Sequence, residues 1–219
     1  MNRNSSKILL AVGLLVLASL SCNALSSLMG GALLQDDFSN RDSGWGTLTD
    51  SNSSVEYSDG GLQMEVFTKN YFIWSTPNKK NYDKVHMEVT VKNNDTDSTT
   101  AFGLMCYQQT VDSAFYYFAM TPAGEYAIAK ASVASSDVFL TNDNKWASSD
   151  AITKNAPSYH LDADCGNGTL TLYVDGKQIT SVTDTNYTTG GVGLFTWSGE
   201  KASSANVTFD DFVMTKLGQ

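Results

Sequence analysis

Three cysteines have the clearest capacity for covalent chemistry in this 219-residue chain: Cys22, Cys106 and Cys165. Cys22 directly follows an apolar run over residues 8–20, which is itself preceded by a short basic start. This is the layout of a secretory signal peptide, and the run is shorter than the ~20 residues that a membrane-spanning helix needs. The other two cysteines would then lie in an exported domain, where a disulfide can form and persist.

The position of Cys22 resembles that of the cysteine in bacterial lipoproteins whose thiol accepts diacylglycerol, with the small residue Ser21 at the cut. An ordinary signal peptide cut nearby and an uncleaved anchor are the alternatives. We expect residues 1–21 to be a lipoprotein signal peptide, residues 22–34 a tether and residues 35–219 one folded domain. The protein would be exported and anchored in a membrane by its N-terminal lipid, on the cell surface or in the periplasm.

Charge excludes one class of partner. The formal net charge of the chain is −9 at pH 7. Because nucleic acids and anionic headgroups would repel such a chain, we expect no nucleic-acid partner.

The common catalytic motifs are absent from the sequence. The chain contains no G-x-S-x-G, no H-E-x-x-H and no phosphate-binding loop. His86 and His160 each alternate with apolar neighbours, which is typical of strand residues that face solvent. Asp162 and Asp164 share a strand face, which is more typical of a solvated outer sheet than of a catalytic pair. We therefore assign no catalytic residue. The sequence favours a protein without catalytic activity but does not decide the question.

The elements that would position these residues are β-strands. Residues 85–92 alternate strictly between apolar and polar, as do residues 169–175, and the second run ends in Asp175-Gly176, a type I′ hairpin signal. Further strands are predicted at residues 62–68, 71–75, 100–108, 114–121, 126–131, 158–165, 178–182, 191–197 and 206–216. Turn-forming clusters separate them, and no window shows a helical stripe. Strands with one apolar face must pack as two sheets, so we predict an all-β, two-sheet antiparallel β-sandwich.

The same alternation places both remaining cysteines on apolar strand faces. Cys106 shares its face with Phe102 and Leu104, and Cys165 shares its face with Leu161 and Ala163. We predict that Cys106 and Cys165 form a disulfide between neighbouring or facing strands, with two free buried thiols as the alternative.

Several segments, in this order, resemble those of concanavalin A-like, laminin-G-like domains of bacterial surface proteins. They include D-D-F-S-N at residues 36–40, L-T-L-Y-V-D-G-K at 170–177, G-V-G-L at 191–194 and F-D-D-F at 209–212. The resemblance implies a jelly-roll sandwich over residues 35–216, with its opening strand beginning at residues 36–40. Members of this group bind glycans or proteins, some are glycanases, and a related group acts on keto-disaccharides. The glucanase motif E-x-D-x-x-E, which would place two carboxylates at the scissile bond, is absent.

Aromatic residues make up 11% of the chain, and several occupy the less buried strand faces. Sugars stack their C–H faces on such rings, while polar groups bind the hydroxyls. Trp74, Tyr107, Tyr117 and Trp197 are our candidates for a concave binding face; cross-strand packing within the sheets is the alternative.

A metal site is a further hypothesis. Asp36-Asp37 opens the predicted domain and Asp210-Asp211 lies in its last strand, and these strands often neighbour each other. Asp37 and Asp210 could therefore converge on a structural calcium ion, which binds carboxylate and carbonyl oxygens. Ordinary exposed or turn-capping aspartates are the alternative.

These observations favour an exported, lipid-anchored, non-catalytic binding module, most plausibly for carbohydrate. A glycan-processing hydrolase of the same fold, and a structural or protein-interaction domain of the cell surface, are the alternatives.

Overall fold

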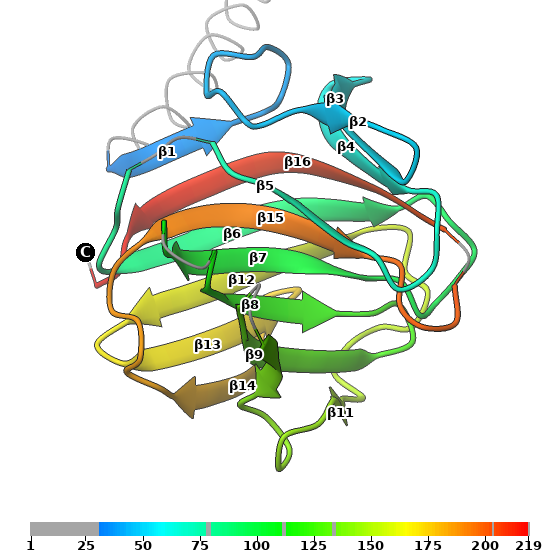
Figure 1. Cartoon of the computed structure of the whole chain (residues 1–219). Helices are drawn as coiled ribbons and strands as arrows, with labels where there is room; N and C mark the ends of the chain where they lie inside the picture. Colours follow the sequence, from blue (N-terminus) through cyan, green and yellow to red (C-terminus); the bar gives the residue numbers. More distant parts are fainter. Residues whose placement is uncertain (1–30, 78–79, 111–112, 133–134, 203, 219) are drawn as a thin grey trace, which may run out of the picture. The chain divides into compact units, whose positions relative to one another are not determined.

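The structure is a computed structural model that describes residues 31–77, 80–110, 113–132, 135–202 and 204–218. Within these ranges all regular secondary structure is β-strand, arranged as two antiparallel sheets (Figure 1). The predicted two-sheet antiparallel β-sandwich of the jelly-roll type is confirmed. In the same part of the chain, no helix is long and apolar enough to cross a membrane.

The compact unit begins at Leu33, close to the predicted start at residue 35. The first strand, β1 (Ala32–Asp36), ends where the opening strand was expected to begin, so that prediction was wrong by about one strand length. The signal peptide over residues 1–21, Cys22 and the tether as far as residue 30 lie outside the described residues.

Among the described residues, the larger sheet has nine strands, with β6 (Val85–Asn93) between β12 (Tyr159–Gly166) and β16 (Ala205–Lys216). Beyond β12 lie β13 (Thr169–Val174) and β14 (Lys177–Thr183); beyond β16 lie β4 (Gly61–Val66), β3 (Ser53–Ser58) and β2 (Leu48–Thr49). Strand β1 pairs with β16.

The smaller sheet has seven strands in the described part of the chain. Their order is β10 (Ser135–Phe139), β9 (Glu125–Ser132), β8 (Phe115–Met120), β7 (Ala101–Gln108), β15 (Gly191–Trp197) and β5 (Phe72–Ser75). The short strand β11 (Ala147–Ser148) pairs with β9. The two sheets lie one behind the other, with β15, β7 and β8 in front of β6 and β12 in the view of Figure 1.

The main core lies between the two sheets and follows from the alternation in the sequence. In β6 the side chains of Val85, Met87, Val89 and Val91 are fully buried, while the residues between them are not. Burying each such side chain contributes about 1.5–3 kcal/mol relative to leaving it exposed. This one-sided burial fixes which face of the sheet is left for solvent or ligand.

Hairpin geometry also follows the sequence. At the β13–β14 turn, Asp175 and Gly176 both have positive φ, of 50° and 73°. Asn167 and Gly168, between β12 and β13, have φ of 55° and 75°. Two successive left-handed residues are the signature of the type I′ turn predicted at Asp175-Gly176.

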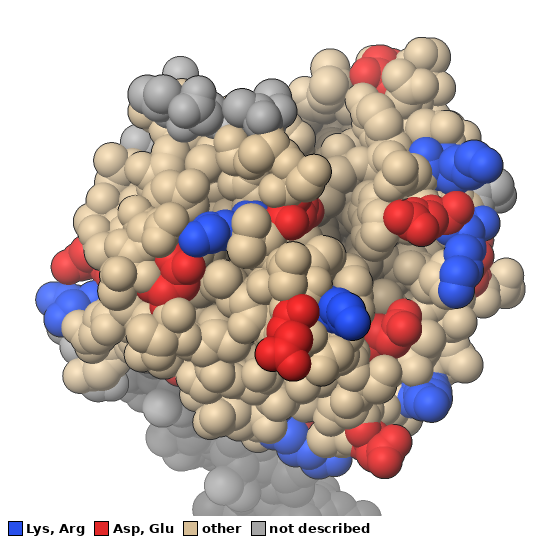
Figure 2. Space-filling view, turned by 60° about the horizontal axis from the view of Figure 1, so that its bottom comes forward, with Lys and Arg blue, Asp and Glu red and all other residues tan. Residues whose placement is uncertain are grey.

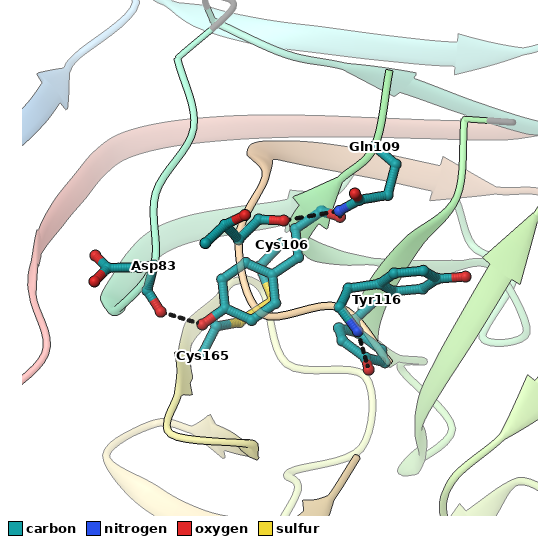
Figure 3. Close-up of a disulfide and its surroundings, with 8 residues drawn as sticks. Asp83, Cys106, Gln109, Tyr116 and Cys165 are labelled. Atoms are coloured by element: carbon teal, nitrogen blue, oxygen red, sulfur yellow. Dashed lines mark hydrogen bonds between the residues drawn. A yellow bond between two sulfur atoms is a disulfide. The ribbon is translucent and has the colours of Figure 1, made fainter. Parts of the chain in front are cut away.

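The disulfide between Cys106 and Cys165 is present, as predicted (Figure 3). Cys106 lies on β7 of the smaller sheet and Cys165 on β12 of the larger one, so the bond joins facing strands across the core. Both residues are fully buried, and their Cα atoms are 6.7 Å apart. The disulfide ties the two sheets together near one end of these strands.

Candidate functional site

The outer face of the smaller sheet, turned away from the main core, carries a second apolar cluster. Its buried members are Met105, Phe115, Tyr117, Ala119, Ala127, Ala129 and Phe195. A groove of about 430 Å³ lies on this face, which is within the usual size range of small-molecule sites. We call it the aromatic groove; it is lined by Asn70, Phe72, Trp74, Ala101, Phe115, Tyr117, Ala119, Ala131, Ser132, Asp137, Phe139, Trp146, Phe195, Trp197 and Glu200.

A row of paired residues explains why this face is hollow. Trp74 pairs with Phe195, and Phe195 pairs in turn with Gly103. Gly103 pairs with Ala119, which pairs with Ala127. Along the row the side chains therefore change from indole and phenyl rings to a hydrogen atom and then two methyl groups. Gly103 is required here, because a Cβ atom would lie 1.8 Å from the carbonyl oxygen of Phe118.

Phenylalanine rings fill the large end of the row. The Phe72 ring stacks on Phe195, with centroids 4.8 Å apart and planes 10° from parallel. It also stacks on Phe115 at 5.9 Å. Because aromatic pairs contribute about 0.5–1.5 kcal/mol beyond their burial, this stack makes a firm floor.

Tryptophan side chains form the accessible part of the groove. Trp74 is 39% exposed, and Trp146 and Trp197 are half-buried. The indoles of Trp146 and Trp197 lie nearly parallel, with centroids 6.2 Å apart. Large aromatic faces that stay open to solvent in a groove are suited to a ligand with flat apolar faces.

One exposed carboxylate in the lining of the groove is held by a hydrogen bond. Asp137, on β10, accepts a hydrogen bond from the Tyr117 hydroxyl at 2.8 Å. Desolvation raises the pKa of Asp137 above its usual value, against the smaller opposing effect of that hydrogen bond. Burial, and then the charge of Asp137, raises the pKa of Tyr117, so the phenol stays protonated and donates. Asn70 and Glu200 add further polar groups at the lining.

The structure brings together three of the four aromatic residues proposed from the sequence. Trp74, Tyr117 and Trp197 all line the aromatic groove. Tyr117 lies at its floor, since only 4% of its surface is exposed.

Tyr107 does not lie in the groove, and its placement on the same face was wrong. Tyr107 is buried in the main core, where its ring contacts Tyr116 and its hydroxyl donates to the Asp83 carbonyl (Figure 3). The cause is a β-bulge. Opposite Gly191 and Val192 the register of β7 shifts by one residue, and Tyr107 takes a left-handed φ of 55°. The extra residue reverses the side to which Tyr107 points.

Trp146 and Asp137 also line the groove and were not predicted from the sequence. Both lie in the segment after residue 131, where no strand was predicted, yet β10 and β11 pair with β9 and bring this segment to the groove. The only local signal was a single tryptophan after the polar run Asn142-Asp143-Asn144-Lys145.

The two aspartates proposed as calcium ligands lie near each other but are engaged locally. The Asp37 carboxylate accepts from the Ser39 backbone NH at 3.0 Å, and the Asp210 carboxylate accepts from the Asp211 NH at 2.8 Å. Desolvation, with the charges of Asp211 and Asp37 acting in the same direction, raises the pKa of Asp210. The calcium site stays a prediction.

No family model matches the chain, and no curated protein is similar to it in sequence. Solved structures do share its fold. A carbohydrate-binding module, CBM66, from Bacillus subtilis superposes with a TM-score of 0.61 at 16% identity, over 79% of this chain and 96% of the module. A Bacillus subtilis protein with a galectin-like fold superposes with a TM-score of 0.63 at 9% identity, over 86% and 97%.

A catalytic protein has the same architecture. The β-glucanase of Bacillus licheniformis superposes with a TM-score of 0.59 at 13% identity, over 85% of this chain and 98% of the enzyme. At these identities the likeness establishes the jelly-roll fold, which hosts both binding and hydrolytic proteins.

Proposed function

We propose that this domain is a non-catalytic carbohydrate-binding module that holds a glycan in the aromatic groove. The observation that carries the proposal is the set of three accessible indoles, Trp74, Trp146 and Trp197, around one groove. Sugar rings present flat C–H faces to such indoles and hydroxyls to polar groups. Asp137, Asn70 and Glu200 are the groove's candidates for binding hydroxyls.

The similar structures support carbohydrate as the class of ligand. One of them is described as a carbohydrate-binding module and another as a β-glucanase, so glycans are ligands of proteins with this architecture. The groove volume of about 430 Å³ suits a few sugar residues rather than a protein surface.

A glycan array with the purified protein tests the proposal. We expect a restricted set of glycans to bind, with a change in tryptophan fluorescence because the rim indoles would be covered. Uniform absence of binding across plant, bacterial and host glycans would contradict it. In that case a structural or protein-interaction role becomes the better explanation.

Hydrolysis by the same groove is the second candidate function. It is favoured by the raised pKa of Asp137, since a general acid must keep its proton close to neutral pH. Incubation with each bound glycan, followed by mass spectrometry of the products, separates the two. Release of shorter products, lost in Asp137→Asn or Glu200→Gln, would establish the enzyme.

We further propose that the protein is exported and carries a lipid on Cys22. The Cys106–Cys165 disulfide supports export, because such bonds are rare in reducing compartments. Labelling of cells with a tagged fatty acid should mark the wild-type protein and not Cys22→Ser. Equal labelling of both would exclude this residue as the anchor.

A further inference from the structure

A second group of ionisable side chains lies on the outer face of the larger sheet, on the paired strands β6 and β12. Glu88 and Asp162 are directly opposite each other in this ladder. Their other neighbours in the same row, Val213 and Tyr173, carry no charge at neutral pH. Like charges directly opposite each other repel, so a cation that contacts both carboxylates would stabilise this pair.

His160 lies over the pair. Its Nε2 atom is 3.0 Å from Asp162 Oδ1 and 3.5 Å from Glu88 Oε2. Glu88, His160 and Asp162 can each offer one ligand atom, and these three atoms lie within 4.8 Å of one another. Asp162 is only 8% exposed, and its buried Oδ1 accepts no hydrogen bond although it lies 3.0 Å from His160 Nε2. A buried carboxylate oxygen without a donor is costly unless an ion completes its environment.

The spacing of these atoms fits coordination to one ion. Ligands about 2.1 Å from a metal lie roughly 3.0 Å apart in octahedral and roughly 3.4 Å apart in tetrahedral geometry. The two distances from His160 Nε2, 3.0 and 3.5 Å, agree with these values. Imidazole and carboxylate ligands together suit zinc and related transition metals, whereas calcium prefers oxygen ligands alone.

Neighbouring side chains hold Glu88 in position. His86 contacts Glu88 Oε1 through Nε2 at 3.0 Å and Asp164 Oδ1 through Nδ1 at 2.6 Å. Asp164 in turn accepts a hydrogen bond from the Tyr173 hydroxyl at 3.0 Å. Such outer contacts orient the carboxylates of metal sites, and here they leave Glu88 Oε2 directed toward His160.

We propose that Glu88, His160 and Asp162 form a binding site for a divalent transition metal of the zinc type, with water completing the coordination. The side chains of His160 and Glu88 are 44% and 37% exposed, so the ion can enter from solvent. The site lies on the other sheet from the aromatic groove and does not depend on the proposed function. A bound ion would bridge β6 and β12 and neutralise the repulsion between their carboxylates.

Isothermal titration of the purified protein with ZnCl2 tests the site, using protein without a histidine tag. All variants carry Cys22→Ser, so that its thiol cannot bind the metal. We expect one Zn²⁺ per chain and affinity at least about tenfold weaker in Glu88→Gln and in His160→Gln. Glu56→Gln, which removes an exposed carboxylate of the same sheet, should bind zinc like the parent protein.

X-ray absorption at the zinc edge provides a second readout, because the imidazole signal should be lost in His160→Gln. If that variant does not fold, Asp162→Asn replaces it. Absence of saturable zinc binding would overturn the proposal. Unchanged affinity in both ligand variants would place zinc elsewhere, and equal affinity for calcium would exclude a site of the transition-metal type.

Discussion

The indole rings of Trp146 and Trp197 stack 20° from parallel at 6.2 Å, although one precedes β11 and the other ends β15. Both rings belong to the lining of the aromatic groove, and their contact favours one arrangement of the pair. A rigid aromatic surface binds with little loss of side-chain entropy. The pair is therefore the part of the groove on which a flat sugar face would gain most.

Replacing Trp146 or Trp197 with alanine should weaken glycan binding by about tenfold or more, because one stacked ring is worth roughly 1.4 kcal/mol or more when desolvated. The double variant should lose less than the sum of the two single effects, since the rings support each other. Titration calorimetry with the best array ligand measures both quantities. Phe67→Ala removes an aromatic side chain that is 49% exposed and lies outside the groove. An equal loss of affinity in that control would contradict a specific role for the pair.

The sequence predicted the disulfide pairing but not the position of Tyr107, the residue next to Cys106. Phe102, Leu104 and Cys106 all face the main core, as the spacing of two residues requires, so the inward direction of Cys106 could be predicted. The bulge begins one residue later and depends on Gly190, where a Cβ atom would lie 2.4 Å from the Tyr107 backbone. A contact between residues so distant in sequence leaves no local signal at Tyr107.

Only some of the residues that line the aromatic groove could be predicted, because the others depend on strand pairing that the sequence does not reveal. Trp74, Tyr117 and Trp197 lie in regular strands whose alternation is visible, and three of the four proposed aromatic residues therefore line it. Asp137 and Trp146 reach the groove through short edge strands paired to β9. Strands of a few residues carry too little periodicity to be detected, because their position is set by pairing rather than by pattern.

Removing the disulfide by replacing Cys106 and Cys165 with alanine should destabilise the domain by roughly 4 kcal/mol. The bond closes a loop with a sequence separation of 59 residues, which sets this value in the chain-entropy model. Urea unfolding of oxidised protein and of the double variant measures the difference. The single variant Cys165→Ala should lose as much, because it also breaks the bond. A loss below about 1 kcal/mol would mean that the unfolded chain is hardly constrained by the bond.

The pH dependence of Asp137 follows from its raised pKa. Since the folded protein disfavours the ionised form, the unfavourable contribution is present above the folded pKa and is relieved as pH falls through it. Asp137→Asn keeps an acceptor for the Tyr117 hydroxyl without the charge, so its stability at neutral pH should equal or slightly exceed that of the parent protein. The gain should be below about 1 kcal/mol, because Asp137 is exposed.

Unfolding of this variant between neutral and acidic pH provides the measurement, and any advantage should shrink as the pH falls. Asp137→Ala is the matched comparison, because it removes the charge and the acceptor together and leaves the buried Tyr117 hydroxyl unpaired. It should be less stable than Asp137→Asn throughout. Equal stability of the two variants would show that the hydrogen bond contributes nothing.

Asp184 should make the sandwich sensitive to acid in the opposite sense. Burial opposes its ionisation, but hydrogen bonds from Tyr116, the Asn186 backbone and Lys130 outweigh this effect and lower its pKa. Lys130 Nζ lies 3.0 Å from Asp184 Oδ2, and both side chains are largely buried. The stabilisation is therefore complete above the unfolded pKa and is lost as pH falls through the folded value.

Tyr116→Phe removes the hydroxyl that donates to Asp184 and accepts from the Tyr187 backbone NH. It should cost about 1–3 kcal/mol at neutral pH, since two partly buried polar groups lose a partner. The cost should fall at low pH, where Asp184 is protonated in both proteins. Lys130→Met removes the cation that pairs with Asp184, and its loss of stability should likewise fall as the pH is lowered. Urea unfolding between neutral and acidic pH measures these losses of stability. A loss in Tyr116→Phe that does not change with pH would mean that it comes from packing and not from Asp184.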